Sequence, residues 1–319
     1  MAFQLMTFRR RDVLLKAVAV AGLGLLPRQA TATEAVRLMC GYGVGNPTDL
    51  CAQLIQDGLS AALDQPVEFD YALGDAGRRA ARHVIDSRPD GKTLLIAEVL
   101  NLVLQDAPAD PLLSRLMPIA KITRGFSTAI VVNQYSSIAD WAGLLAAART
   151  SRLKAATTGL DSTVGLLLAL VEQRMKLSFD PVETESTKAA VGLLLTRRAE
   201  LAAVDTRLAL LHNKRDSTKL RIIATSGARR SPELPQVPTL AELVGDPKLA
   251  YTISYGVFAP AATAPAVAAR LTAALLGMRD DKSLQSQARL ADIPVQIDGP
   301  SAVLETIARD RRVAQDIGR

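Results

Sequence analysis

The sequence predicts an α/β protein of two lobes that are joined by strands crossing between them. Short apolar runs with strand character alternate with helix-patterned segments, which is typical of parallel sheets covered by helices. The alternation starts again after the middle of the chain, and no segment of flexible linker composition separates the two series. Two lobes joined in this way form a cleft, where small ligands usually bind.

The composition is that of an ordinary soluble globular protein. A length of 319 residues suggests about two domains. Hydrophobic residues make up 49% of the chain and charged residues 22%, which provides enough apolar surface for a core and excludes a disordered chain. Aromatic residues make up only 4%, so the core is expected to be aliphatic. This scarcity argues against binding of single-stranded nucleic acid by base stacking.

The net charge of +6 does not indicate a nucleic-acid partner. The first 32 residues hold five basic side chains and one acidic side chain, a surplus of four, which leaves only two for the rest of the chain. A small basic cluster at Arg78, Arg79 and Arg82 is the one local exception. Without a dense basic stripe, nucleic-acid binding is not expected.

Residues 1–32 have the pattern of an export signal. Arg9-Arg10-Arg11 is followed by an apolar run at residues 17–26, too short for the roughly 20 residues that cross a bilayer. Ala30-Thr31-Ala32 then forms a small-x-small cleavage site, so the mature chain is expected to start near Thr33 and to work in the periplasm. The arginines before Asp-Val-Leu-Leu-Lys resemble a twin-arginine signal, and an Arg-rich secretory signal is the alternative.

The first series of elements runs from residue 36 to residue 97. Strands are expected at residues 36–42, 65–69 and 92–97, and helices at residues 49–63 and within 74–87. Apolar side chains at helical spacing support the longer helix: Leu50, Leu54, Ile55, Leu59 and Leu63. Thr48 is the expected N-cap of this helix, and Asp49 is favourable in its first turn.

The second series supplies the other lobe. Strands are expected at residues 129–133, 153–157, 200–204 and 220–225, and helices at residues 138–150, 162–175 and 188–196. The strand at 220–225 is expected to return the chain to the first lobe, which a strand at 254–258 and mostly helical final residues complete. We therefore assign residues 33–124 and 225–319 to lobe 1 and residues 125–224 to lobe 2.

A glycine-rich loop between the first strand and the first helix is the first candidate site. Its glycines let backbone N–H groups face a ligand, and the helix N-terminus adds a positive partial charge, so an anion is the expected guest. The candidate residues are Tyr42, Gly43, Val44, Gly45, Asn46, Thr48 and Asp49. A tight structural turn is the alternative. As a dinucleotide fingerprint the loop is weak, because the third glycine is missing, although Asp70 lies at a suitable distance for a ribose.

A second hydroxyl-rich loop lies between a strand and a helix of the other lobe. If this loop lies across a cleft from the first loop, the N-termini of two helices can hold one acidic ligand between them. The candidate residues are Thr158, Gly159, Asp161, Ser162 and Thr163. Helix capping by Asp161 or Ser162 is the alternative for these side chains.

Catalytic and metal chemistry are poorly supported by the sequence. The two cysteines, Cys40 and Cys51, are expected to be buried thiols. A disulfide between them stays open, because it requires Cα atoms within about 7 Å, a distance that the sequence does not give. His83 and His212 are the only histidines and are expected at the surface. No zinc spacing, nucleophile elbow or cofactor motif is present, so neither enzymatic activity nor a cofactor is expected.

Several segments resemble the Bug family of solute receptors of tripartite tricarboxylate transporters. The longest spans residues 224–242 and resembles the family's S-x-x-R-S-P-x-L-P-D-V-P-T-x-x-E segment. Residues 37–49, 63–67, 89–95 and 255–260 resemble further family motifs in the same order. The similarity covers nearly the whole mature chain.

The resemblance implies a two-lobed periplasmic binding protein of the Venus-flytrap type, without catalysis. It implies that ligand carboxylates meet backbone amides of the first loop, at residues 43–46, and that residues 158–163 contribute from the second lobe. Asp205 falls where the family often has an aspartate. The implied partners are a small carboxylated solute and the membrane subunits of a tripartite tricarboxylate transporter, and the receptor is expected to be a monomer.

This chain departs from the family pattern near the implied site. Gly45-Asn46 replaces a Gly-Gly pair, Ser162-Thr163-Val164 replaces Ser-Thr-His, and Thr184-Glu185-Ser186 replaces Tyr-Lys-Gly. Arg78, like Asp75, is a charge that the usual site lacks, and we include Arg78 and Ser186 among the candidate ligand-binding residues. An unusual ligand, or loss of ligand binding, therefore stays open. Two other functions stay open: an exported α/β enzyme or nucleotide binder that uses the first loop, and a sensor without transport.

Overall fold

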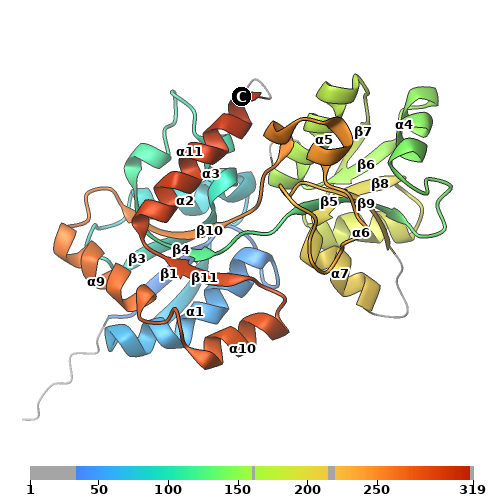
Figure 1. Cartoon of the computed structure of the whole chain (residues 1–319). Coiled ribbons are helices and arrows are strands. Elements are labelled where there is room, and N and C mark those ends of the chain that lie inside the picture. Colours follow the sequence, from blue (N-terminus) through green and yellow to red (C-terminus); the bar gives the residue numbers. More distant parts are fainter. Residues whose placement is uncertain (1–33, 160–161, 215–219, 317–319) are drawn as a thin grey trace, which may run out of the picture. The chain divides into compact units, whose positions relative to one another are not determined.

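The computed structural model describes residues 34–159, 162–214 and 220–316, which form one compact unit. The expected export signal, its twin-arginine motif and candidate residue Asp161 lie outside the described residues. The described part has two mixed sheets, each covered by helices (Figure 1). This is the α/β architecture with two sheets that the sequence predicts.

The first sheet has six strands in the order β11-β4-β10-β3-β1-β2. These are β1 (Val36–Cys40), β2 (Val67–Tyr71), β3 (Thr93–Glu98), β4 (Leu116–Thr123), β10 (Tyr255–Pro260) and β11 (Val295–Asp298). The expected parallel pairing is found between β1 and both of its neighbours, β2 and β3. The sheet is mixed because β10 runs antiparallel to β3 and β4, and β11 antiparallel to β4.

Alternating strand residues build a core on each face of the first sheet. Leu38 of β1 belongs to the core with α1 (Pro47–Leu63), α9 (Pro265–Leu276) and α10 (Lys282–Leu290). The next residue, Met39, belongs to the core with α2 (Arg78–Ile85), α3 (Val99–Gln105) and α11 (Pro300–Asp316). Figure 1 shows these two groups of helices on opposite sides of the sheet. Short 3₁₀ turns at Asp75–Gly77 (η1) and Leu113–Arg115 (η2) precede α2 and β4.

The second sheet has five strands in the order β7-β6-β8-β5-β9. They are β5 (Thr128–Asn133), β6 (Lys154–Thr157), β7 (Asp180–Glu183), β8 (Leu201–Asp205) and β9 (Leu220–Thr225). β6 is parallel to β7 and β8, whereas β5 is antiparallel to β8 and β9. One face packs on α4 (Trp141–Thr150) and α5 (Thr163–Met175), and the other on α6 (Thr187–Leu195) and α7 (Thr206–Lys214).

The strand at 220–225 does not return the chain to the first sheet, so that expectation is wrong. β9 pairs with β5 along its length and forms an edge of the second sheet. The chain continues through α8 (Leu240–Val244) and the 3₁₀ turn η3 (Pro247–Leu249) before it reaches β10. Leu240, Leu249 and Tyr251 are buried in the core that contains α4 and α5. The lobe boundaries that we assigned stay a prediction.

Two segments cross between the sheets, and they are hydrogen-bonded to each other. Phe126, between β4 and β5, donates its N–H to the Ile253 carbonyl at 3.0 Å, and the Ile253 N–H donates to the Phe126 carbonyl at 2.7 Å. Next to this pair, the hydroxyls of Thr128 and Tyr251 are 2.7 Å apart. The crossing is thus a short antiparallel ribbon rather than two separate tethers.

Three further expectations can be compared with the described residues. Cys40 and Cys51 are free, buried thiols, as predicted. His83 is exposed on α2, as predicted, and His212 is half-buried on α7.

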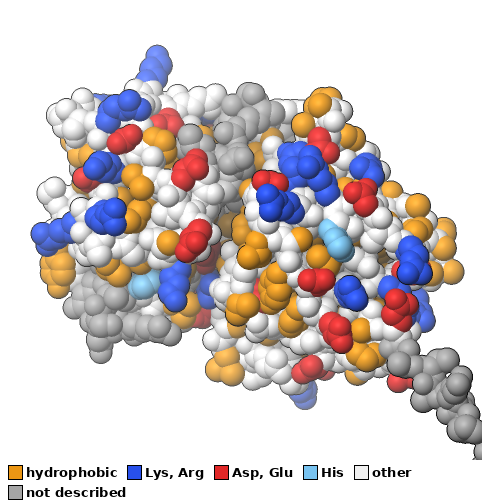
Figure 2. All heavy atoms as spheres, turned by 180° about the vertical axis from the view of Figure 1, so that it is seen from behind, with side chains coloured by type: hydrophobic (Ala, Val, Ile, Leu, Met, Phe, Trp, Pro, Cys, Tyr) orange, Lys and Arg blue, Asp and Glu red, His pale blue; other side chains and the backbone are white. Residues whose placement is uncertain are grey.

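No described helix is long and apolar enough to span a membrane. Lys, Arg, Asp and Glu are interspersed over the face shown in Figure 2.

Candidate functional site

A pocket that is partly open to solvent is lined by residues from both sheets. The first sheet and its loops contribute at three places: the loop before α1, the end of β3 and the start of β10. The second sheet contributes the starts of α5 and α6 and the end of β8. The lining residues are Tyr42, Asn46, Pro47, Glu98, Thr158, Ser162, Thr163, Val164, Glu185, Ser186, Thr187, Asp205, Ile253 and Tyr255.

The glycine-rich loop brings the start of α1 to this pocket. Asn46, not Thr48, is the N-cap, because its side-chain oxygen accepts a hydrogen bond of 2.9 Å from the Thr48 N–H. Pro47 suits the first helical position because that position needs no N–H donor. Thr48 is buried in the first turn and lines a neighbouring inner pocket instead. Tyr42 and Asn46 are therefore the candidate residues of this loop that line the main pocket.

Asp49 supports the loop from inside rather than lining the pocket. It is fully buried, and its Oδ2 accepts hydrogen bonds from the Gly45 N–H at 2.7 Å and from Gln53 Nε2 at 2.8 Å. Its Oδ1 accepts a hydrogen bond of 2.6 Å from the Tyr71 hydroxyl. Both carboxylate oxygens are thus bonded within the protein, and Asp49 fixes the backbone that carries the site.

The three remaining candidates of the first loop do not line the pocket. Gly45 has a φ of +83°, a left-handed conformation in which a side chain would be strained. Val44 is 80% exposed, and Gly43 is half-buried beside it. These residues shape the turn between β1 and α1.

The hydroxyl-rich loop places the start of α5 at the pocket. Ser162 is the N-cap of α5 and accepts a hydrogen bond of 3.1 Å from the Gly165 N–H. It also donates to the Gly159 carbonyl at 2.7 Å and accepts a hydrogen bond of 3.0 Å from the Thr158 hydroxyl. Capping by Ser162, the structural alternative, therefore coexists with a position at the pocket. Gly159 has a φ of +109° and forms the turn before α5, but it does not line the pocket.

A third helix, α6, begins at the same pocket. Its N-cap is Ser186, whose side chain accepts a hydrogen bond of 3.2 Å from the Ala189 N–H. Sequence reasoning singled out Ser186 but missed Glu185 and Thr187, which line the pocket beside it. A cap residue followed by an apolar helix was the available signal for this site.

Asp205 closes the pocket at the end of β8. It is 3% exposed, and its Oδ1 accepts a hydrogen bond of 2.8 Å from the Leu208 N–H and lies 3.6 Å from Arg207 Nε. Its Oδ2 is buried and has no hydrogen-bond partner. Burial raises the pKa of the Asp205 carboxyl, and the neighbouring Arg207 acts in the opposite direction.

Glu98 is the principal lining residue that sequence reasoning missed. It is the last residue of β3, and its Oε1 is buried without a hydrogen-bond partner. Burial first, and then the charges of Asp310 and Asp205, raise the pKa of its carboxyl to about 8, while a hydrogen bond from Tyr255 lowers it. The available signal was an acidic side chain at the carboxyl end of a buried parallel strand, where ligands of α/β proteins bind.

Arg78 does not reach the pocket. Its guanidinium forms an ion pair with Asp110 and a hydrogen bond with the Gln105 carbonyl. Arg78 begins α2, and the neighbouring residues Ala76 and Gly77 line only the inner pocket. Its basic side chain is therefore paired with Asp110, which also pairs with Arg82, away from the site that we expected it to join.

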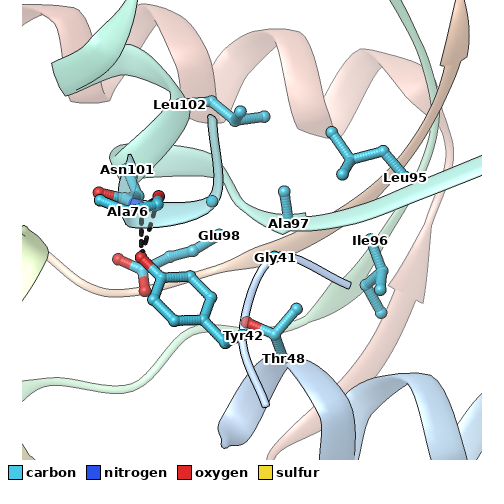
Figure 3. Close-up of a pocket in the computed structure, with 11 residues that line it drawn as sticks. Gly41, Tyr42, Thr48, Ala76, Leu95, Ile96, Ala97, Glu98, Asn101 and Leu102 are labelled. Carbon is cyan, nitrogen blue, oxygen red and sulfur yellow. Dashed lines mark hydrogen bonds between the residues drawn. The ribbon is translucent and has the colours of Figure 1, made fainter. Parts of the chain in front are cut away.

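The smaller inner pocket shares Tyr42 and Glu98 with the main one. Figure 3 shows Tyr42, Glu98 and Asn101 gathered at one side and the apolar side chains of Leu95 and Leu102 at the other. The Tyr42 hydroxyl donates to the Ala76 carbonyl at 3.0 Å and accepts from Asn101 Nδ2 at 2.7 Å. These bonds fix the ring of Tyr42 between the two pockets.

Comparison with known proteins identifies the family. The model of the tripartite tricarboxylate transporter family receptor, TctC, matches residues 51–294. The chain belongs to the TctC family. This is a family of solute-binding receptors and not of enzymes, with the fold of periplasmic binding proteins.

Two curated relatives agree with this TctC assignment. A UPF0065 protein of Bordetella bronchiseptica is 31% identical over 248 residues, which cover 74% of this chain and 70% of that protein. Protein BugT of Bordetella pertussis is 27% identical over 292 residues, which cover 89% of this chain and 86% of BugT. The Bug resemblance predicted from the motifs is thereby confirmed.

Solved structures confirm the fold predicted for this TctC member. MatC from Rhodopseudomonas palustris with bound malate has a TM-score of 0.74 at 23% identity. The superposition covers 88% of this chain and 98% of the MatC chain. A second R. palustris protein, with adipate, has a TM-score of 0.76 at 23% identity, with coverage of 89% and 97%. The periplasmic binding protein BugD has a TM-score of 0.76 at 18% identity, again with coverage of 89% and 97%.

Proposed function

We propose that this TctC-family receptor captures a small carboxylated organic molecule in the pocket between its two sheets. The loaded receptor would then present the solute to the membrane subunits of a tripartite tricarboxylate transporter. In this proposal residues 1–32 direct export, and the receptor works in the periplasm. Ligand binding would favour the arrangement of the lobes that the membrane subunits recognise.

The observation that carries the proposal is the convergence of three helix N-termini on one pocket. The N-caps of α1, α5 and α6 are Asn46, Ser162 and Ser186, and all three line it. The first N–H groups of a helix have no intrahelical acceptor, and the helix dipole adds positive partial charge there. Such an arrangement suits a carboxylate without requiring a basic side chain.

Thr163 brings a hydroxyl group to the pocket. Its side chain is buried, with 2% of the residue exposed, and its Oγ1 has no hydrogen-bond partner within the protein. Thr163 is the first residue of α5 and lines the pocket. A ligand oxygen at this helix start would satisfy the hydroxyl, which is otherwise costly to bury.

The relatives support a carboxylated ligand. MatC is described with bound malate and a second R. palustris protein with adipate, and both share the fold of this chain. Residues from both sheets line the pocket in this chain, as a ligand-dependent closure requires. We therefore place the solute against the starts of α1, α5 and α6.

The test is a thermal-shift screen of the protein with carboxylic and amino acids, followed by calorimetric titration of the hits. A ligand at about 100 times its Kd adds roughly 2.7 kcal/mol of stability, which moves the melting temperature clearly. Thr163→Val keeps the side-chain shape and removes the hydroxyl, so we expect weaker binding of any hit. Thr150→Val at the end of α4 is the matched control. Absence of binding across the screen would contradict the proposed function.

A further inference from the structure

The pocket is acidic, although its family relatives are described with carboxylates. Among its described lining residues, Glu98, Glu185 and Asp205 carry carboxyl groups, and none is Lys or Arg. Arg207 pairs with Oδ1 of Asp205 but is not a lining residue. A dicarboxylate would therefore face the helix N-termini with one end and these carboxyl groups with the other, and wherever they are ionised the like charges repel in a partly desolvated site.

Three atoms of this pocket are buried without a hydrogen-bond partner: Glu98 Oε1, Asp205 Oδ2 and Thr163 Oγ1. Asp205 and Thr163 are 3% and 2% exposed, so water has little access to them. Both carboxyl oxygens are pure acceptors when ionised, and buried acceptors without donors are costly. Any hydrogen-bond donor would satisfy them, and a positively charged donor does so most strongly.

The described residues argue for an organic cation over a metal ion. No group of three His, Cys, Asp or Glu side chains in the described ranges is close enough to hold a metal. Tyr42 and Tyr255 also line the pocket, and Tyr255 stacks on Phe126 with ring centroids 5.8 Å apart. Aromatic rings next to acidic groups are typical of sites for ammonium groups.

We infer that the solute of this receptor carries a protonated amine as well as a carboxylate, and that Glu98 recognises the amine. This inference rests on the proposed function, because the helix N-termini still receive the carboxylate. Glu98 binds the ammonium group, Oδ2 of Asp205 offers a second acceptor, and the starts of α5 and α6 receive the carboxylate end. The substrate class is thus an amino acid or another aminocarboxylate rather than a plain dicarboxylate.

The groups around Glu98 determine how readily its carboxyl ionises, and therefore how it responds to a charged ligand. Asp205 on β8 and Asp310 on α11 disfavour its ionised form, and Tyr255 on β10 stabilises that form by a hydrogen bond. Burial raises the pKa of the carboxyl, so in the free protein much of it is protonated at neutral pH. An ammonium group has to displace this proton, and its binding is therefore expected to strengthen as the pH rises from 6 to 8. Other charged or titratable groups beside these residues are Tyr42, Arg207, Tyr251 and Arg309.

Matched ligands of equal length separate the two substrate classes. We would titrate the protein calorimetrically with succinate, glutarate and adipate, and with 4-aminobutyrate, 5-aminovalerate and 6-aminohexanoate. We expect at least one aminocarboxylate to bind ten-fold or more tightly than the dicarboxylate of its length. Glu98→Gln should weaken that aminocarboxylate at least ten-fold and leave the dicarboxylates equal or stronger. The control is Glu68→Gln on the exposed side of β2, which should change neither series.

The contrary results are equally specific. If dicarboxylates bind more tightly than aminocarboxylates, and Glu98→Gln weakens their binding, then a protonated Glu98 donates a hydrogen bond to a ligand carboxylate. That result would overturn the inference and leave the proposed function intact. Affinity for an aminocarboxylate that falls from pH 6 to pH 8 would also overturn it, in the native protein and without any variant. Absence of binding by both series would contradict the proposed function itself. The melting temperature of Glu98→Gln verifies that the variant is folded.

Discussion

The hydroxyl of Tyr71 donates a 2.6 Å hydrogen bond to Oδ1 of Asp49, and this bond ties the end of β2 to the first turn of α1. The other oxygen of the same carboxylate accepts the Gly45 N–H. One buried aspartate of α1 therefore holds the glycine-rich loop and links it to β2. Its contribution is to the shape of the pocket, which it does not line.

Removing this hydroxyl should destabilise the protein. Hydrogen bonds to charged groups contribute about 1.5–3 kcal/mol, so we expect Tyr71→Phe to lower the free energy of unfolding by that order. Denaturant unfolding measures the change. Tyr135→Phe is the control, since Tyr135 is 74% exposed. Equal stability of Tyr71→Phe and the unmodified protein would mean that the bond to Asp49 contributes nothing net.

Glu98 should make the protein less stable as the pH rises. Its pKa is about 8 in the folded state, above the ordinary value of 4.5, so the folded state holds the proton more tightly than the unfolded chain. This contribution is fully present below about pH 4.5 and is lost as the pH rises to 8. The slope is at most about 1.4 kcal/mol per pH unit.

The Glu98→Gln variant isolates this contribution. We expect it to be more stable than the unmodified protein at pH 8.5 and closer to it at pH 5, as measured by thermal melting at both values. The pKa of Asp310 is also raised, to about 6, and that group remains in both proteins, so the comparison reports Glu98 together with its coupling to Asp310. Parallel pH profiles for the two proteins would show that Glu98 titrates normally.

Both thiols should be unreactive in the native protein. Burial raises the pKa of Cys40 to about 12 and that of Cys51 further still, and neither residue is exposed. Because the thiolate is the reactive form, a colorimetric disulfide reagent at pH 8 should titrate no thiol natively and two in guanidinium chloride. Rapid native labelling of either residue would mean that the core beside β1 opens readily.

Arg78 should matter for stability and not for ligand affinity. Its bond to the Gln105 carbonyl and its ion pair with Asp110 attach α2 to the end of α3 and to the segment that follows. We expect Arg78→Ala to lower the melting temperature and to leave unchanged the Kd of any ligand found in the screen. Arg149→Ala on the exposed end of α4 is the control for loss of a surface charge. A large change in Kd would return Arg78 to the list of ligand-binding residues.

Most helices and strands could be predicted from local pattern, and the errors have local physical causes. The strand at 220–225 was predicted with the correct bounds, but its sheet was not, because pairing with β5 is a long-range choice that apolar pattern does not encode. The N-cap of α1 was predicted two residues late, at Thr48. Asn46 and Thr48 are both good N-cap residues, and Pro47 takes the first helical position after Asn46.

The candidate site was predicted best where it follows helix starts. Ser162, Thr163 and Ser186 lie at the pocket, as capping motifs after short strands suggested. Glu98 was missed because it ends a strand and belongs to no glycine or hydroxyl motif, and its position beside Asp205 arises only when the two sheets meet. Arg78 does not line the pocket, and the sequence does not show its partner, Asp110, 32 residues later.

The paired crossing between the sheets has a consequence for the entropy of ligand binding. Since Phe126 and Ile253 are hydrogen-bonded in both directions, neither segment can change its backbone angles alone. Rotation of one sheet against the other has to bend both strands together, which leaves fewer directions of motion than two independent tethers. We therefore expect the free receptor to sample fewer arrangements than it would with independent tethers, so that a solute that fixes one of them removes less conformational freedom. Small ligands with few contacts can be held tightly under that condition.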